Sequence, residues 1–299
     1  MPNKPAYTTT QQIELLKQRG MQFRNEASAE HTLKNISYYR LKGYWWDLQT
    51  DRTDHIIQPG TFFEDVIEYY KFDRKLRGIL FDAIEMIEIS LRTKMIYHFS
   101  LTYDGTWYLK PSLFDNNDIY LRNINELKVQ FDRSQEIFIK DHKRRFPNRD
   151  ADSWKTFEIA SMGILSKFYK NTKHQLLEKS IIAREMGLNL HNELSSWLEA
   201  ISYLRNIIAH HSRLWNRPMV KNPKINLNNP SGKWFSDQLT DNQKKKPFLI
   251  ISCMVYLCDQ IEPKNKIKDR IKELILETPR MPVYKLGFCN NWNNQPVWK

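Results

Sequence analysis

Residues 205–217, RNIIAHHSRLWNR, combine side chains that suit phosphodiester chemistry. Arg205 and Asn206 are followed closely by two adjacent histidines, His210 and His211. An arginine can bind a phosphate through paired hydrogen bonds and stabilise the charge of the transition state. A histidine titrates near neutral pH and can accept or donate a proton. Because RNA carries its own nucleophile, the 2′-OH, these residues suit a metal-independent cleavage that leaves a 2′,3′-cyclic phosphate and a 5′-OH.

The spacing of arginine and histidine does not identify this site by itself. Five of the eight histidines follow an arginine with four to six residues between them: His31, His98, His191, His210 and His211. The last two are distinguished by the Arg-Asn pair, the expected helix end and the following SRLWNR, in which Arg213 and Arg217 add charge and Trp215 adds a ring for stacking. A simpler interpretation stays open, in which the histidines only complement the dipole at the end of a helix.

A helix expected at about 192–211 carries an apolar stripe with Arg205 at its edge. The stripe consists of Leu194, Trp197, Leu198, Ile201, Leu204 and Ile208. An arginine beside a core-facing stripe is costly unless it is paired or extends into water. In a continuous helix, Arg205 and His210 point roughly 140° apart, so one phosphate could not easily contact both. Either the helix ends near Ala209, or a second chain completes the site.

The second alternative implies a homodimer. A twofold axis brings the same surface of both chains together, so two His210 side chains could reach one phosphate. Trp197, Leu204 and Ile208, with nearby Trp215, would then form the contact between the chains, or else the core beneath it.

The charge of the chain favours a polyanionic partner, and RNA is the one we expect. Lys and Arg number 46 against 34 Asp and Glu, which gives a net charge of +12 and a pI near 9.4. Nucleic acid is the most common such partner, although a basic protein without one is the simpler alternative. Aromatic residues make up 13% of the chain, and single-stranded bases stack on such rings.

Basic and aromatic residues are densest between residues 34 and 46. The residues expected to contact RNA there are Lys34, Tyr38, Tyr39, Arg40, Lys42, Tyr44 and Trp45. The alternative is that these rings belong to the core, with Tyr39 and Trp45 inside.

Helical periodicity predicts an all-α fold. A first helix follows the threonines near residue 9, and a second runs from about Ala27 into LKNISYYRLKGYW. A long helix is expected from about Phe62 to Leu101, with one polar face made of Arg74, Arg77, Glu85, Glu88 and Arg92. Within this face Glu88 and Arg92 are one turn apart and can pair, and a solvated face with surface ion pairs is the simplest interpretation.

Three regions are expected along the chain. Residues 1–60 form an N-terminal helical segment that could contact RNA, and residues 61–220 form the helical core. Residues 221–299 contain a long polar loop followed by an apolar helix and an amphipathic one.

Several classes of protein are disfavoured. No apolar run approaches the roughly 20 residues of a membrane span, and the N-terminus has no apolar signal core. Three cysteines, Cys253, Cys258 and Cys289, lack zinc-ligand spacing and fit reduced thiols in the cytoplasm. No carboxylate cluster suited to two magnesium ions stands out, and no cofactor or metal is expected.

Five segments in the right order resemble the Abi-like (AbiD/AbiF) abortive-infection proteins of bacteria. They are ISYYRLKGYW (36–45), YYKFDRKLRGIL (69–80), IEISLRTK (87–94), SMGILSKFY (161–169) and RNIIAHHSRLWNR. The resemblance covers about residues 10–220. It implies a HEPN-type helical bundle, here with additional N- and C-terminal helices, in which an arginine–histidine motif marks a metal-independent endoribonuclease related to that of type VI CRISPR effectors.

The resemblance also implies roles for individual residues and further partners. The motif arginine is Arg205, its polar neighbour is Asn206 and the motif histidine is His210, while His211 extends the pair. Glu88 and Arg92 fall where such folds place a supporting polar helix. Defence against phage is implied, together with a structured noncoding RNA encoded beside the gene in some members.

Two other classes of function remain as alternatives. In the first, the same histidines only hold an RNA in a non-catalytic binding module. In the second, the chain is a protein-interaction scaffold whose basic surface is incidental. Salt dependence separates RNA binding from the scaffold, because counterion release makes RNA affinity fall steeply as salt rises.

Overall fold

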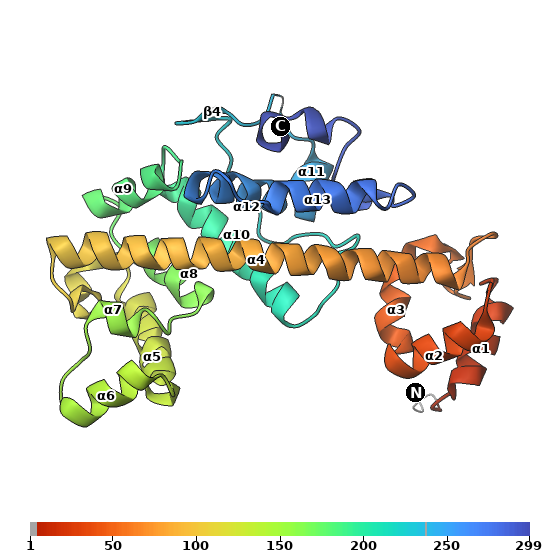
Figure 1. Ribbon diagram of the computed structural model, residues 1–299, viewed down its shortest axis with the longest axis horizontal. Helices are drawn as coiled ribbons and strands as arrows, with labels where there is room; N and C mark the ends of the chain where they lie inside the picture. Colours follow the sequence, from red (N-terminus) through yellow and green to blue (C-terminus); the bar gives the residue numbers. More distant parts are fainter. Residues whose placement is uncertain (1–4, 237) are drawn as a thin grey trace. The chain divides into compact units, whose positions relative to one another are not determined.

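The computed structural model describes residues 5–236 and 238–299, and α-helices dominate it (Figure 1). The expectation of an all-α fold is confirmed, since the described residues form only two small antiparallel sheets. In one sheet β1 (Gln49–Asp51) pairs with β2 (Ile56–Ile57), with Gln49 opposite Ile57. In the other, β3 (Asn228–Asn229) pairs with β4 (Gly232–Lys233).

The chain divides into two compact units. The first comprises residues up to Gly78 and Leu274–Met281, and the second comprises Ile79–Glu273 and Pro282–Lys299. These boundaries differ from those expected at residues 60 and 220. The first boundary falls inside a helix, and residues 221–273 belong to the second unit.

The first unit contains three short helices and the start of a long one. These are α1 (Thr9–Gln18), α2 (Glu26–Asn35), α3 (Tyr38–Trp45) with the 3-10 turn η1 (Trp46–Leu48), and the first part of α4 (Phe63–Thr102). The single helix expected from Ala27 onward is wrong, because the backbone of Ile36 is extended. The side chain of Ser37 then accepts a hydrogen bond from the Arg40 N–H at 3.3 Å and starts α3.

The long helix α4 matches its expected bounds, but its polar face is not uniformly solvated. Arg77 is only 6% exposed and forms an ion pair with the fully buried Asp73. Asp73 also accepts a hydrogen bond from the hydroxyl of Tyr44 at 2.7 Å. The expectation is therefore corrected at Arg77, since a buried carboxylate one turn away requires a countercharge.

The core of the second unit forms around α10 (His191–Ala209). This helix packs against α8 (Met162–Asn171), α9 (Leu177–Glu185) and α12 (Pro247–Ile261), while α5 (Asn117–Arg133) packs on α8. The other helices that lie wholly in this unit are α6 (Ile137–Arg145), α7 (Ser153–Thr156), α11 (Asp241–Lys245), η2 (Trp107–Leu109), η3 (Pro111–Leu113), η4 (Val283–Leu286), η5 (Trp292–Asn294) and η6 (Pro296–Trp298). The remaining helix, α13 (Ile267–Leu276), contains the boundary between the units.

The region after residue 220 supplies part of this core. Every residue of α12 from Pro247 to Cys258 is buried. Near the C-terminus Trp298 is fully buried, and its indole N–H donates to the hydroxyl of Ser252 at 3.0 Å. The ring of Trp298 also lies 6.2 Å from that of Phe248. The C-terminal segment is therefore integral to the second unit.

A buried carboxyl lies in the first turn of α10. Glu193 is 2% exposed, and its Oε1 accepts the Asn226 N–H at 2.8 Å. Its Oε2 is buried without a hydrogen-bond partner among the described residues. Burial raises the pKa of Glu193 to about 7, because the desolvated carboxylate is disfavoured more than the Asn226 hydrogen bond favours it.

This carboxyl makes the stability of the protein dependent on pH. Since the folded-state pKa of Glu193 is raised, the stability it contributes is complete below pH 4.5 and is lost as the pH rises through about 7. As the pH rises from 4.5 to 8, the unfolding free energy of Glu193→Gln should increase relative to that of the wild type by about 3 kcal/mol. Urea denaturation at both pH values measures this, with the exposed Glu262→Gln as the control. A wild-type-minus-variant difference that does not change with pH contradicts the assignment.

Candidate functional site

The expected site lies where α10 ends. The helix stops at Ala209, followed by His210 with φ −84° and ψ 11° and by His211 in the left-handed region with φ 53°. The His211 N–H donates to the carbonyl of Ile208 at 2.8 Å, and the Ser212 N–H donates to that of Ile207 at 2.9 Å. These two bonds form a Schellman cap. The helix therefore ends at Ala209, as the first of the two alternatives for Arg205 and His210 expected.

The cap places a histidine where glycine is usual. A left-handed conformation costs an L-residue about 1 kcal/mol, and glycine avoids this cost. His210 and His211 are both exposed, and the backbone between them turns out of the helix. The His210 N–H still donates to the carbonyl of Asn206, as it would in the helix, so the helix end alone does not bring Arg205 and His210 to the same side.

The side chains of the three motif residues make no polar contact within the described part of the chain. The side chains of Arg205, Asn206 and His210 form no hydrogen bond or ion pair with any described residue, and Arg205 is half-buried. A histidine that served as a side-chain cap would donate to the last carbonyls of the helix. The carbonyl of Asn206 instead accepts the backbone N–H of His210 at 3.1 Å. These side chains are thus available to an external anion.

The residues after the cap are engaged with backbone. Arg213 donates to the carbonyl of Trp215, and Arg217 donates to the carbonyl of Arg213 at 3.1 Å. Asn216 has φ 49°, so these arginines support a tight turn. The expectation that Trp215 offers a ring for stacking is corrected, since Trp215 is fully buried.

The apolar arc of α10 belongs to the core. Trp197 and Leu204 are fully buried, and Ile208 is 5% exposed. The indole N–H of Trp197 donates to the carbonyl of Lys224 at 2.7 Å, and its ring lies 4.9 Å from that of Trp234. Of the two interpretations of this arc, the contact between chains is wrong, because the chain's own residues cover it.

The expected pair on α4 is present and extends to a neighbouring loop. Arg92 donates to Glu88 at 2.8 Å and to the carbonyl of Ala160 at 3.0 Å, and it lies 3.5 Å from Glu158. Its side chain is 12% exposed. Arg92 therefore fastens α4 to the segment that precedes α8, and it is not free to bind a phosphate.

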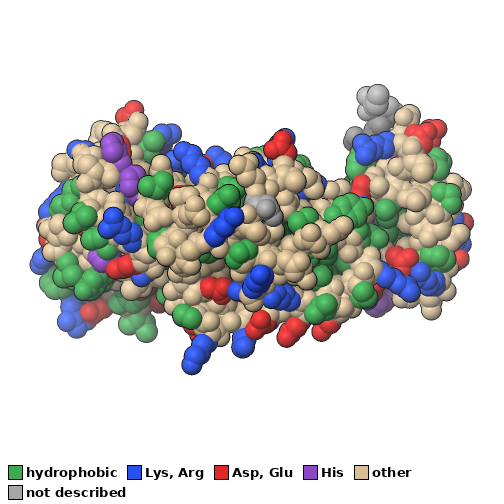
Figure 2. Space-filling view, turned by 90° about the horizontal axis from the view of Figure 1, so that it is seen from above, with side chains coloured by type: hydrophobic (Ala, Val, Ile, Leu, Met, Phe, Trp, Pro, Cys, Tyr) green, Lys and Arg blue, Asp and Glu red, His purple; other side chains and the backbone are tan. Residues whose placement is uncertain are grey.

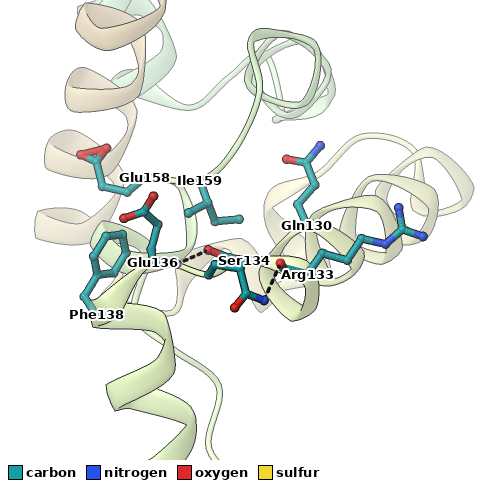
Figure 3. A pocket seen from close by; sticks show the side chains of 8 residues that line it. Gln130, Arg133, Ser134, Glu136, Phe138, Glu158 and Ile159 are labelled. Atoms are coloured by element: carbon teal, nitrogen blue, oxygen red, sulfur yellow. Dashed lines mark hydrogen bonds between the residues drawn. The ribbon is translucent and has the colours of Figure 1, made fainter.

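A hollow of about 700 Å³ adjoins this network. Figure 3 shows Glu136 and Glu158 on one side of it, with the guanidinium of Arg133 directed away from both. The two carboxylates outnumber Arg133, which is the one Lys or Arg in the lining, so a phosphate is disfavoured in this hollow. This hollow is consequently no candidate for the RNA backbone.

The aromatic and basic segment of the first unit is partly exposed. Tyr44 and Trp45 are 2% and 1% exposed, so the expectation that they contact RNA is corrected: both rings pack in the core. Tyr39 is 79% exposed, which contradicts the alternative that it lies inside. The ammonium of Lys42 lies 5.9 Å from the Tyr39 ring and 5.2 Å from the ring of Trp46, which is 41% exposed.

Trp46 lies at the end of the expected segment 34–46 but is not among the individual residues expected to contact RNA. Tyr39 and Trp46 are seven residues apart, which is two helical turns and hence the same face. Among the other expected RNA-binding residues, Lys34 pairs with Glu30 at 3.0 Å, Tyr38 accepts a hydrogen bond from Arg19 at 3.0 Å, and Arg40 lies 6.0 Å from the ring of Tyr70. The exposed rings of Tyr39 and Trp46, with the half-buried Lys42 close to both, form the patch that remains.

The positively charged side chains are dispersed over the face of the molecule shown in Figure 2. On the face shown in Figure 2, Lys and Arg side chains are interspersed with acidic ones and form no single continuous patch. Ion pairs such as those of Lys170 and Lys221 with Glu199, at 2.6 and 2.5 Å, neutralise part of it. Charge on this face therefore does not locate an RNA site.

Three further observations concern residues 5–236 and 238–299. The structure brings no three His, Cys, Asp or Glu side chains of this part together in a way that could hold a metal ion. None of its helices combines the length and apolar character that crossing a membrane requires. Cys253 and Cys258 are buried free thiols, and Cys289 is also free.

Comparison with known proteins gives one result. A family model described as Abi-like protein matches residues 31–216, which include α3, α4, α8 and the end of α10. No match is found among the curated proteins or among the solved structures. The match spans more than half of the 299 residues and lies inside the expected range of about 10–220. The chain therefore belongs to the Abi-like family.

Proposed function

We propose that this protein is a bacterial abortive-infection protein that cleaves RNA as a metal-independent HEPN-type endoribonuclease. Membership of the Abi-like family supports the defence against phage. The observation that carries the enzymatic part is the end of α10, where Arg205, Asn206 and His210 have no polar partner among the described residues. An unpaired arginine beside exposed histidines fits an anionic substrate.

The proposed reaction is an intramolecular transesterification. A histidine, His210 in our assignment, takes the proton of the 2′-OH, and the 2′ oxygen attacks the adjacent phosphorus. Arg205 binds the non-bridging oxygens as their charge grows. The bond to the 5′ oxygen breaks, and that oxygen receives a proton from a second acid. The products are a 2′,3′-cyclic phosphate and a 5′-OH.

The second acid has two possible sources. His211 of the same chain is exposed next to His210. His210 of a second copy is the other source, if the protein acts as a homodimer. Asn206 is assigned to hold the phosphate, since its amide can donate to an oxygen. A structured noncoding RNA is proposed as a restraining partner, and an RNA-binding module without catalysis is the alternative function.

The first test measures cleavage of single-stranded RNA in excess EDTA. The wild type is expected to produce cyclic-phosphate ends, because the proposed mechanism uses no metal. His210→Ala should abolish cleavage and leave RNA affinity nearly unchanged, since it removes a proton carrier. Arg205→Ala should reduce both, because it removes the phosphate contact as well.

A matched variant separates chemistry from folding. His211→Gly removes the second imidazole and relieves the left-handed strain, and thermal denaturation of the variant measures whether the helix end stays stable. A loss of cleavage in a stable His211→Gly protein assigns the acid to His211. Cleavage by His210→Ala at the wild-type rate overturns the site, while RNA binding without any cleavage by the wild type favours the binding module.

The second test asks whether two chains form one site. If each site needs two His210 side chains, equal amounts of wild-type and His210→Ala chains that pair at random should retain about one quarter of the activity rather than one half. Light scattering of the same samples gives the oligomeric state. Activity of one half, or a fully active monomer, shows that a single chain carries the whole site.

The third test concerns the exposed patch on α3. A base stacked on a ring contributes roughly 1–3 kcal/mol, so Tyr39→Ala should weaken RNA binding about fivefold or more. Tyr284→Ala, which removes a ring that is 60% exposed, serves as the control. Titrations at several salt concentrations report the phosphate contribution. Equal affinities for the two variants and the wild type indicate that the patch does not bind RNA.

A further inference from the structure

The second unit contains a hollow that the proposed cleavage does not use. It measures about 440 Å³ and lies between α5, α6 and residues 146–151, in the region drawn yellow-green in Figure 1. Small-molecule sites in proteins typically measure roughly 300–1,000 Å³. Its volume therefore suits a small ligand or a single unit of a polymer.

The hollow contains a buried histidine with a free acceptor. His142 is 5% exposed, and its Nε2 lies 2.9 Å from the carbonyl oxygen of Arg149. Because a carbonyl oxygen only accepts, Nε2 must carry the proton, so Nδ1 of the neutral ring is an acceptor. Nδ1 is buried and has no partner among the described residues. A buried acceptor without a donor is unfavourable. Since His142 lines the hollow, an N–H group of a ligand that reaches Nδ1 would satisfy it.

Aromatic rings surround this acceptor. The Phe131 ring lies 6.1 Å from the His142 ring, nearly at right angles to it, and the Phe146 ring lies 5.5 Å away on a tilt. Phe146 is 44% exposed, so one of its faces is accessible. Tyr108, whose hydroxyl donates to the Ala151 carbonyl at 2.6 Å, also lines the hollow. Flat rings next to a hydrogen-bond acceptor suit a planar heterocycle.

Charged groups at the edge suit the rest of a nucleotide. Lys128 and Arg149 line the hollow, are exposed, and form no ion pair or side-chain hydrogen bond with the described residues. Lys143 is held in place by the carbonyls of Phe131 and Asp132, both at 2.9 Å. The carboxylates of Asp132 and Asp150 line it as well and can accept from hydroxyl groups. Cations for a phosphate and acceptors for a ribose thus occur together.

We propose that this hollow binds a nucleotide, with the base against Phe146 and the His142 acceptor and the phosphate at Lys128 and Arg149. The nucleotide could be a free mononucleotide or one unpaired nucleotide of an RNA, since both offer the same chemistry. The proposal does not depend on cleavage at the end of α10. The two hollows differ in the balance of charge. In the hollow proposed to bind a nucleotide, Lys128, Lys143 and Arg149 outnumber two carboxylates, whereas in the hollow of Figure 3 Glu136 and Glu158 outnumber Arg133.

The probes are the four nucleoside monophosphates, their nucleosides and ribose 5-phosphate, titrated calorimetrically against the full chain. At least one monophosphate should bind at millimolar concentration or below, more tightly than its nucleoside and than ribose 5-phosphate. The ¹⁵N resonance of His142 Nδ1 should shift on saturation, because that nitrogen gains a donor. Displacement of a short single-stranded RNA by the monophosphate distinguishes the two sources.

Two variants test separately the binding of the base and the binding of the phosphate. Phe146→Ala should weaken binding of both nucleoside and nucleotide about fivefold or more, since it removes the stacking face. Arg149→Ala keeps the backbone carbonyl that holds His142, so it should weaken the monophosphate about fivefold and leave the nucleoside unchanged. Phe138→Ala and Arg144→Ala on α6 are the matched controls, because neither residue lines this hollow.

The outcomes decide the proposal. Selective losses in Phe146→Ala and Arg149→Ala support it, whether the ligand is free or part of an RNA. It is overturned if no monophosphate and no RNA binds, or if binding is the same in these variants as in their controls. Loss of cleavage in His210→Ala with unchanged nucleotide binding keeps this proposal separate from the proposed function.

Discussion

The burial of one face of α10 is the constraint on which the second unit depends. Trp197, Leu198 and Leu204 are fully excluded from solvent by neighbouring helices and by the chain after residue 220. Burying each such side chain contributes about 1.5–3 kcal/mol, so this face fixes the rotation of the helix about its axis. Once that rotation is fixed, the directions in which the polar side chains of the last turn point are fixed as well. Arg205 and Asn206 are therefore positioned by residues that carry no chemistry.

The ionisable side chains at the two ends of α10 differ in their exposure to solvent. At its start the carboxyl of Glu193 is buried, and at its end His210 and His211 are exposed. A helix dipole favours an acidic group at the start and cations at the end. Charge placement is thus compatible with a purely structural role at both ends. The half-buried Arg205 distinguishes a structural role from an anion-binding one. Among the described residues, its guanidinium interacts neither with the end of the helix nor with a carboxylate.

The sequence predicts the strongly periodic parts of this protein well. The bounds of α4 and the position of α10 follow from apolar spacing, and the Glu88–Arg92 pair follows from one-turn separation. Family membership was also predictable, because five segments match in order. The break between α2 and α3 was harder to predict, since Ser37 caps a helix in the middle of a continuous apolar pattern.

Burial of individual aromatic and charged residues could not be predicted from composition. Tyr39 and Tyr44 stand in the same basic segment, yet one is 79% exposed and the other 2%. The difference arises from Asp73, about thirty positions later, which binds the hydroxyl of Tyr44. Arg77 is buried for the same reason. A local sequence pattern cannot predict long-range partners of this kind. It also cannot predict the hollow between α5, α6 and residues 146–151, whose lining residues are far apart in the sequence.

The buried position of Trp298 bears on the stage of synthesis at which the second unit can complete its core. A chain emerges from the ribosome from its N-terminus, and domains generally fold as units. Because Trp298 and Phe288 complete the packing around α12, the second unit lacks part of its core until these last residues have been added. The helix that presents Arg205 and His210 packs on α12 and gains its full support only then. Under the proposed function, this order would delay RNA cleavage until the chain has been translated as far as Trp298, and a chain truncated before that residue lacks a finished core.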